Sequence, residues 1–404
     1  MSNWHPWSQL NSKKITLDAG DGIYLFDDLG TKYIDAKSGC LNSILGYGND
    51  RIAGAILNCI ERLHNVDFQT FSHQAANNYS KRILESVGLP ELEYCFYTSG
   101  GSEAVEMALK TIIDYRIINN QKDKKYIISI DKGYHGSTFL TSALSGLPQM
   151  KNCFFEKHSF VHHLRISSLK NDFQVFAEEV GYSKISAFVF EPVLGVGGYV
   201  FPNKNELEWV LKECKTHNIM LIADETFTGF GRLGSMTASE EYKTSPDILI
   251  LGKGITAGYF PFAVTLVGKD IHDTFKNDKY LQGLRYGHTN SGHIIGTTIA
   301  NEVLDILYEE NLFENAKRIG RYIYNKVFNK LGSKITNYRY RGALIAFDCI
   351  QNSQELENCL YNNNLLLKCQ GNCFAIIPPL NITLQEADEI VERLFCSLDE
   401  FYSR

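Results

Sequence analysis

The sequence predicts an α/β protein in which a mostly parallel sheet is covered by helices on both faces and is joined to a smaller α+β unit. Three observations support this prediction. Short apolar runs alternate with amphipathic segments from residue 50 to about residue 300, polar residues follow the apolar runs, and long helical segments with isolated short strands follow beyond residue 300. Parallel strands that are buried on both faces read as continuous apolar runs, so the central region favours a covered parallel sheet.

The central region contains six apolar runs of the kind expected for buried strands. In open α/β sheets, ligands bind beyond the carboxyl ends of the strands. The runs cover residues 93–98, 125–130, 187–191, 219–224, 248–251 and 262–267. The polar residues at or just after their carboxyl ends are Thr98, Asp131, Glu191, Asp224 and Lys253.

The two ends of the chain predict one smaller unit. Two alternating runs within residues 22–35 flank an Asp-Leu-Gly turn, which is typical of a hairpin. We expect this hairpin to pack with the C-terminal part, so that residues 1–48 and 297–404 form a discontinuous small domain and residues 49–296 form the large domain. The C-terminal part reads as helices over 297–308, up to about 331 and over 385–401, with short strands near 344–348 and 373–377.

Length and composition suit a globular protein and exclude several classes of function. The chain has 404 residues, of which 44% are hydrophobic and 21% charged, and a net charge of −6 without a long basic run, so no nucleic-acid partner is expected. No apolar stretch approaches the ~20 residues that span a bilayer, and the N-terminus lacks the regions of a secretory signal. We therefore expect a soluble, cytoplasmic protein that has no membrane partner.

The ten cysteines indicate reduced thiols. They form no CxxC pair and no Cys/His group at zinc spacing, so no metal site is expected. Cys369 and Cys373 are the only close pair, and a redox or metal role for them is the less favoured interpretation.

Lys253 and Asp224 are the central candidates for catalysis. Asp224 ends one apolar run, and Lys253 follows another after a glycine. A lysine amine forms a Schiff base with an aldehyde and transfers protons once it is partly desolvated. An acid beside a pyridine nitrogen keeps that nitrogen protonated and makes the ring an electron sink. Taken singly, each residue is more often a solvated turn or a helix cap, but together they point to pyridoxal phosphate.

Two glycine-rich segments add candidates for cofactor binding. Gly101 and Ser102 stand between a strand and an amphipathic helix, where small residues and exposed N–H groups favour a phosphate, although plain helix capping explains this segment equally well. Tyr134 follows a glycine after the run 125–130 and can stack on a planar ring, although an aromatic in such a turn more often packs in the core.

The run of motifs resembles the class III aminotransferases, which are pyridoxal-phosphate enzymes of fold type I. The matching motifs occur in family order and extend over nearly the whole chain. The resemblance implies a large domain with a seven-stranded, mostly parallel sheet, a homodimer with shared active sites, and transaminase activity (EC 2.6.1). The motifs are SGCLNSILGYGN (38–49), SGGSEAVE (99–106), GYHG (133–136), EPVLGVGG (191–198), ADETFTGFGR (223–232), PDILILGKG (246–254), GHTNSGH (287–293) and IPPL (377–380).

The resemblance also implies a role for each residue that matches a motif. Lys253 carries the Schiff base and transfers the proton, and Asp224 pairs with the pyridinium. Gly101 and Ser102 hold the phosphate, with Thr289 of the other subunit completing the cup. The remaining cofactor contacts implied are Tyr134 on one face of the ring, Thr226 on the other, and Glu191 near the ring hydroxyl or the substrate.

The chain departs from the family pattern at three positions, the first of which is Thr226, where relatives usually have Val or Ile. Phe227 stands where relatives often have Gln, so it cannot donate a hydrogen bond to the ring hydroxyl. Lys368 stands where relatives that act on amino acids commonly have an Arg that grips the substrate carboxylate, and Lys lacks the bidentate fork of Arg. We expect Trp7, Leu41 and Phe71, together with Tyr134, to line an apolar substrate entrance; the alternative is that the N-terminal tryptophans only anchor an arm on the partner subunit.

The leading functional hypothesis is a two-step transfer of an amino group from an amine or amino acid to an aldehyde or ketone. It proceeds through the Lys253 aldimine and a pyridoxamine phosphate intermediate. One alternative is an aminomutase or racemase of the same fold, and another is a non-catalytic binding protein of that fold. The motifs identify neither the donor nor the acceptor.

Overall fold

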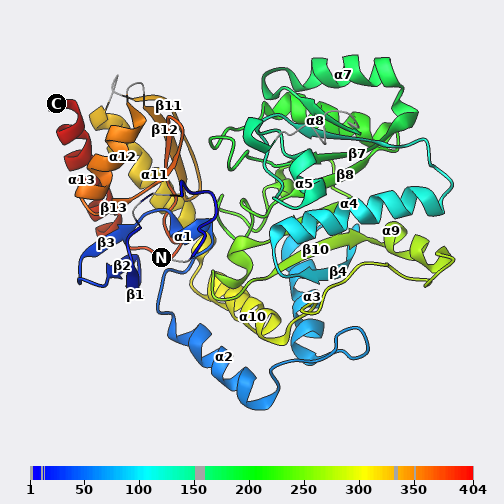
Figure 1. Ribbon diagram of the computed structural model, residues 1–404, viewed down its shortest axis with the longest axis horizontal. Helices are drawn as coiled ribbons and strands as arrows, with labels where there is room; N and C mark the ends of the chain where they lie inside the picture. The colour runs from blue at the N-terminus through cyan, green and yellow to red at the C-terminus, as the bar shows by residue number, and fades with distance from the viewer. Residues whose placement is uncertain are drawn as a thin grey trace.

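The computed structural model describes residues 3–10, 12, 14–150, 160–331, 335–349 and 352–403. Within these residues the strands form three sheets (Figure 1). The largest has seven strands in the order β4-β10-β9-β8-β7-β5-β6, and all neighbours pair in parallel except those of β10. The predicted seven-stranded, mostly parallel sheet is therefore confirmed. Its strands are β4 (Leu92–Thr98), β5 (Tyr126–Ile130), β6 (Val161–Leu164), β7 (Ile185–Phe190), β8 (Met220–Asp224), β9 (Ile248–Leu251) and β10 (Ala263–Gly268).

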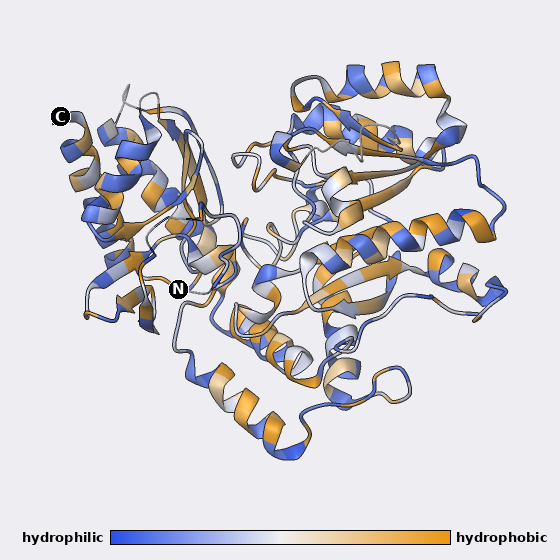
Figure 2. Cartoon of the chain, viewed as in Figure 1, coloured by the Kyte–Doolittle hydropathy of each residue, from blue (hydrophilic) through white to orange (hydrophobic). Residues whose placement is uncertain are grey.

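Helices cover both faces of this sheet because successive side chains of a buried strand point to opposite faces. Ile248 and Ile250 of β9 pack in the cluster that contains the buried side of α4, whereas Leu249 and Leu251 pack in the cluster on the other face. Figure 2 shows these central strands as largely hydrophobic. The helices of this body are α2 (Asp50–Arg62), α3 (Gln74–Val87), α4 (Gly101–Ile118), α5 (Phe139–Leu144), α7 (Leu169–Val180), α8 (Lys204–Thr216), α9 (Lys269–Thr274) and α10 (Ile294–Glu309).

The two smaller sheets lie on the other side of the molecule, beside both termini of the chain (Figure 1). Apolar residues from 23–36 and from 319–401 share one hydrophobic core there, whereas α10 packs against α2 and α3. The domain boundaries at residues 48 and 296 remain predictions. The elements are β1 (Leu17–Asp21), β2 (Tyr24–Asp27), β3 (Lys32–Asp35), α1 (Ser38–Leu41), α11 (Leu312–Leu331), β11 (Ile335–Arg341), β12 (Leu344–Cys349), α12 (Ser353–Asn362), β13 (Leu365–Leu366), β14 (Lys368–Gln370), β15 (Cys373–Ile376) and α13 (Leu384–Ser403).

The structure contains the six predicted strands, the hairpin and the predicted C-terminal helices, with boundaries shifted by up to about three residues, as element ends commonly are. It also contains strands that the sequence pattern did not reveal. β6 has the sequence Val-His-His-Leu, in which two polar residues interrupt the apolar run, and β13 has only two residues. No helix in the described ranges is both long and apolar enough to cross a bilayer.

Candidate active site

The candidate site lies at the carboxyl edge of the large sheet, where Asp224 and Lys253 come together. Asp224 is the last residue of β8 and pairs in parallel with Ile250 of β9. Lys253 follows three residues beyond Ile250 and begins a short 3-10 turn, η5 (Lys253–Thr256). Because β8 and β9 are neighbouring parallel strands, their ends deliver the carboxylate and the amine to the same edge of the sheet.

Thr226 occupies the space between the two glycine-rich turns of this edge. A Cβ atom at Gly252, just before Lys253, would lie 3.0 Å from Thr226 Cγ2, and one at Gly101 would lie 2.8 Å from the same atom. Lys253 itself is half-buried and has a φ of 40°, a left-handed conformation that is uncommon outside glycine. The absence of side chains at Gly101 and Gly252 therefore lets the starts of α4 and η5 approach Thr226 closely.

Asp224 is paired with a buried histidine. Its Oδ2 lies 2.9 Å from His135 Nδ1, and its Oδ1 accepts a hydrogen bond of 3.1 Å from the Thr226 N–H. Burial opposes ionisation of Asp224, but its hydrogen bond and charge interaction with His135 outweigh burial and lower the pKa of Asp224. Burial likewise opposes a charge on His135, yet the Asp224 carboxylate raises the pKa of His135. The site therefore holds an ionised acid beneath the carboxyl edge of the sheet.

Glu191 connects the loops that follow β5 and β7. Its Oε1 accepts a hydrogen bond of 2.9 Å from the Tyr134 N–H, and its Oε2 accepts one of 2.9 Å from the Gly195 N–H. Burial raises the pKa of Glu191 to about 7, although the charge of His135 opposes this shift. Both carboxylate oxygens of Glu191 thus accept hydrogen bonds from backbone N–H groups, and one of these bonds fixes the backbone at Tyr134.

The start of α4 offers free N–H groups next to this cluster. No side chain in the described part of the chain caps α4, and a Cβ atom at Gly100 would meet no atom within 4 Å. Ser102 Oγ accepts a hydrogen bond of 3.3 Å from the Ser137 N–H. An uncapped helix start with open space before it suits a phosphate group.

Tyr134 stands over this region with Trp7 beside it. Tyr134 OH lies 2.8 Å from Ser137 Oγ, and the Tyr134 and Trp7 ring centroids are 6.1 Å apart in an edge-to-face arrangement. Trp7 is 66% exposed, so one of its faces remains open. The N-terminal segment that carries Trp7 therefore reaches the aromatic side chain next to Glu191.

Together these residues fit pyridoxal phosphate. The α4 start suits the phosphate, the buried Asp224 carboxylate suits the ring nitrogen, Lys253 suits the aldehyde, and Tyr134 and Thr226 suit the two ring faces. His135 Nε2 and Thr226 Oγ1 are buried polar atoms that have no hydrogen-bond partner among the described residues.

Within the described residues, no hydrogen bond, ion pair or ring contact joins four other predicted site residues to this cluster. Leu41 is buried in an apolar cluster with Phe227, which a Cβ atom at Gly195 would touch at 3.2 Å. Phe71 is 63% exposed, Thr289 is exposed, and Lys368 is half-buried on β14.

The structure adds His135 as a candidate that the sequence did not single out. His135 lies within the GYHG motif, but the motif alone does not show that its ring faces Asp224, 89 residues further along the chain. The available signal was a histidine directly after the expected ring-stacking Tyr134, at the end of a buried strand.

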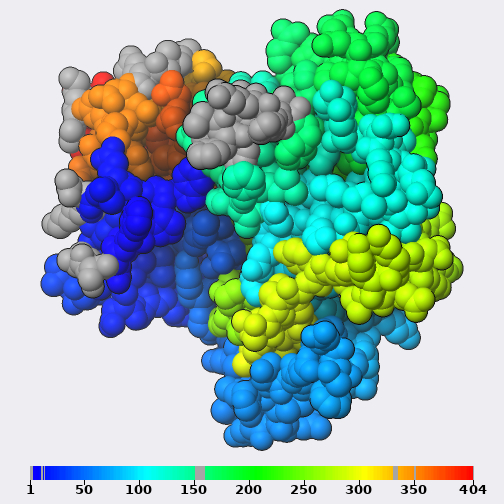
Figure 3. Space-filling model, turned by 45° about the vertical axis from the view of Figure 1, so that its right-hand side comes forward, coloured from blue at the N-terminus to red at the C-terminus, as the bar shows by residue number. Residues whose placement is uncertain are grey.

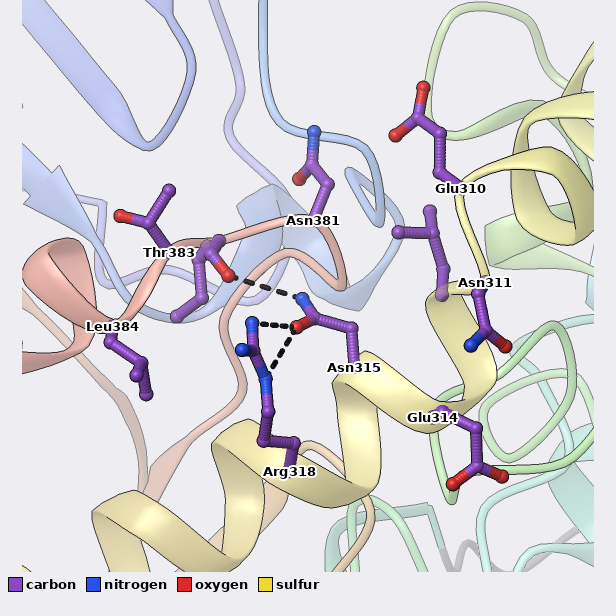
Figure 4. A pocket seen from close by; sticks show the side chains of 10 residues that line it. Glu310, Asn311, Glu314, Asn315, Arg318, Asn381, Thr383 and Leu384 are labelled. Atoms are coloured by element: carbon purple, nitrogen blue, oxygen red, sulfur yellow. Dashed lines mark hydrogen bonds between the residues drawn. The ribbon is translucent and has the colours of Figure 1, made fainter.

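A separate cleft of about 730 Å³ lies between the start of α11 and the segment that leads into α13. Asn315 lines it, donates a hydrogen bond of 3.1 Å to the Ile382 carbonyl and accepts hydrogen bonds from Arg318 (Figure 4). The residues that line it include none of the predicted site residues.

Comparison with known proteins identifies the family. Residues 8–398 match the family model of the class-III aminotransferases. The chain belongs to this family. It is 30% identical over 429 residues to the adenosylmethionine-8-amino-7-oxononanoate aminotransferase of Helicobacter pylori, covering 98% of this chain and 96% of the relative. It is 29% identical over 419 residues to a probable gamma-aminobutyrate transaminase 4 of Oryza sativa subsp. japonica, covering 95% of this chain and 87% of the relative.

Solved structures agree with this membership. An amine transaminase from an uncultivated Pseudomonas species, in its PLP-bound form, superposes with a TM-score of 0.93 at 26% identity and covers 99% of each chain. A transaminase from the marine bacterium Virgibacillus superposes with a TM-score of 0.90 at 29% identity and covers 98% of this chain and 96% of that structure. This class-III aminotransferase therefore uses pyridoxal phosphate to transfer amino groups, as the sequence predicted, and the mutase, racemase and non-catalytic alternatives are less favoured.

Proposed function

We propose that Lys253 is the residue that captures the cofactor aldehyde and moves the proton during amino transfer, and that Asp224 holds the ring nitrogen. The placement of both residues at the carboxyl ends of the neighbouring parallel strands β8 and β9 carries this proposal. Pyridoxal phosphate, when bound, supplies an electron sink that stabilises a carbanion at the substrate carbon.

The protein residues then have distinct tasks. The Asp224 carboxylate, kept ionised by its hydrogen bond with His135, favours a protonated ring nitrogen. With the cofactor held here, Lys253 Nζ would accept the proton of the donor carbon that carries the amino nitrogen and would return a proton on the cofactor side of that nitrogen. Lys253 is half-buried at a glycine turn, so water is partly excluded from its side chain.

The other residues position the cofactor. We assign the phosphate to the start of α4 at Gly101 and Ser102, and the two ring faces to Tyr134 and Thr226. Glu191 supports this assignment because its carboxylate fixes the backbone N–H of Tyr134. Phe227, packed against the loop at Gly195, leaves this side of the site without a donor to the ring hydroxyl.

We further propose a substrate entrance bounded by Trp7, Leu41, Phe71 and Lys368. Trp7 next to Tyr134 supports an aromatic wall. Lys368 is a point charge, so recognition of a carboxylate there is weaker than with an Arg fork. This combination favours a terminal amine, or a carbonyl on a longer and less charged molecule. The probable gamma-aminobutyrate transaminase and the amine transaminase among the similar proteins support that preference, because both are named for amine donors.

A homodimer with shared active sites completes the proposal. Helix α2 projects from the body and exposes Leu57 and Ile60 at 57% and 45% (Figures 1 and 3). A cleft of about 410 Å³ lies between α2, α3 and α10. Large exposed apolar side chains beside a cleft are typical of a protein–protein interface, and twofold symmetry is the commonest arrangement of two copies. In this proposed dimer, Thr289 of the second copy completes the phosphate cup. A cytoplasmic location remains the expectation from the sequence.

Single half-reactions test this function. The visible absorbance of the bound cofactor should fall when a competent amine donor is added without an acceptor, and should return when a keto acid is added. Lys253→Ala should lose both changes. Retention of both changes in Lys253→Ala would show that another group performs the transfer, whereas complete turnover of a single amine without an acceptor would favour the mutase or racemase alternative.

A further inference from the structure

A tight loop after β7 lies between the candidate site and the C-terminal sheet. The Leu194 N–H donates a hydrogen bond of 3.0 Å to the Val200 carbonyl and closes the base of the loop. Tyr199 within the loop is fully buried and has a φ of 55°. The Gly195 N–H is the donor to Glu191 Oε2 at 2.9 Å. The position of Glu191 Oε2 therefore depends on the position of this loop.

Arg339 on β11 donates hydrogen bonds to the C-terminal end of the loop, at Gly198 and Tyr199. Its Nε donates a hydrogen bond of 2.9 Å to the Tyr199 carbonyl, and its Nη2 donates to the Gly198 carbonyl. Asp348 orients the guanidinium at 3.3 Å. Cys373 of β15 donates to the same Gly198 carbonyl at 3.4 Å and accepts from Arg339 at 3.1 Å. Two adjacent carbonyls are thus held by one planar group, which suits the forked geometry of Arg.

Gln370 on β14 contacts the N-terminal end of the loop, at Gly195 and Val196. With its amide nitrogen facing the loop, Gln370 donates hydrogen bonds to the Val196 carbonyl at 2.8 Å and to the Gly195 carbonyl at 3.3 Å. Alternate residues of a strand share a face. Lys368, two residues before Gln370, therefore lies on the face of β14 that looks toward the loop.

Glu191 links the position of this loop to the position of Tyr134. Its other oxygen accepts from the Tyr134 N–H at 2.9 Å, and Glu191 is 5% exposed. A buried carboxylate whose two oxygens are committed to different loops couples the positions of those loops, because losing either donor leaves a buried acceptor unsatisfied.

We propose that Arg339 and Gln370 are positioning residues for the cofactor: they hold the loop 195–199 so that Glu191 keeps Tyr134 seated over the cofactor ring. This inference rests on the proposed function, in which Tyr134 covers that ring. Strand β14 then contributes to the site twice. Lys368 lies at the proposed substrate entrance, and Gln370 holds the loop that positions Tyr134.

Arg339→Lys removes the fork but keeps the charge, so the side chain can donate to only one of the two carbonyls at a time. Gln370→Leu removes the second grip without adding a charge. Arg341→Lys is the matched control, because Arg341 lies two residues along the same strand and pairs with Glu241 rather than with the loop. The three variants are titrated with pyridoxal phosphate, and its visible circular dichroism is recorded per bound cofactor. Urea unfolding of the cofactor-free proteins is measured in parallel.

We expect Arg339→Lys and Gln370→Leu each to weaken cofactor affinity roughly tenfold, the loss expected for one hydrogen bond, and to lower the circular dichroism signal per bound cofactor. Arg341→Lys should match the wild type in both measurements. Equal cofactor affinity and equal circular dichroism signal in the wild type and all three variants would overturn the positioning role of Arg339 and Gln370 while leaving the proposed function intact. An equal loss in Arg341→Lys, paralleled by lower stability of the cofactor-free protein, would also overturn it. A wild-type protein that fails to bind the cofactor would instead refute the proposed function.

Discussion

Replacement of His135 by Leu removes the donor on which the Asp224 carboxylate depends. The two side chains are 2.9 Å apart, and His135 and Asp224 are only 2% and 5% exposed. A hydrogen bond to a charged group contributes about 1.5–3 kcal/mol, and removing one partner of a buried ion pair costs about 3–5 kcal/mol. The Thr226 N–H remains as a donor to Asp224, so we expect a loss of about 2–4 kcal/mol in the free energy of unfolding of the cofactor-free protein.

The pH dependence of this loss follows from the directions of the two pKa shifts. Because the pKa of His135 is raised, its contribution is complete below the ordinary value of 6.5 and is lost as the pH rises through the folded value. Because the pKa of Asp224 is lowered, its contribution is complete above the ordinary value of 3.8 and is lost as the pH falls through the folded value. The difference between wild type and His135→Leu should therefore be largest between these two ordinary values.

Urea unfolding of the cofactor-free proteins, followed by circular dichroism over a series of pH values, measures this difference. His135→Asn is the control, because its amide nitrogen can still donate to Asp224 without a charge, and it should lose less than half as much stability. Equal losses in the Leu and Asn variants, or a loss in the Leu variant that does not change with pH, would refute the role given to the His135–Asp224 pair.

Two further predictions address the cofactor and the substrate. Gly101→Ala places a Cβ atom 2.8 Å from Thr226 Cγ2, closer than the ~3.5–4.0 Å optimum for carbon atoms; it should cost about 1–3 kcal/mol of stability, and Thr226→Ser should restore part of that loss. Purely additive effects in this double-mutant cycle would contradict the contact. Lys368→Met should raise KM for carboxylate-bearing substrates about tenfold, which corresponds to the loss of one charge-assisted contact. It should leave KM for neutral amines unchanged. Lys368→Arg should lower KM for the carboxylate-bearing substrates. Unchanged KM values in both variants would remove Lys368 from the substrate site.

The apolar runs made the architecture of the large sheet predictable. A strand that is buried on both faces needs apolar residues throughout, so β7, β8 and β9 stood out, and so did the polar residues at their ends. Asp224 and Lys253 could be singled out for this reason. β6 could not, because its two central histidines break the apolar run.

Contacts between distant segments were beyond the reach of these patterns. Periodicity assigns a side chain to a face of its element, but not to the partner that it meets there. The contact between His135 and Asp224 joins positions 89 residues apart, and that between Arg339 and the Tyr199 carbonyl joins positions 140 residues apart. Thr289 is exposed, and its role across a dimer interface stays a prediction.

Reductive trapping tests the central claim most directly. The protein saturated with pyridoxal phosphate is treated with borohydride, digested, and the labelled peptides are identified by mass spectrometry. The account predicts a reduced pyridoxyl group on Lys253 in nearly every chain. A label on a different lysine, or an unmodified Lys253 in protein that has bound the cofactor, would contradict it.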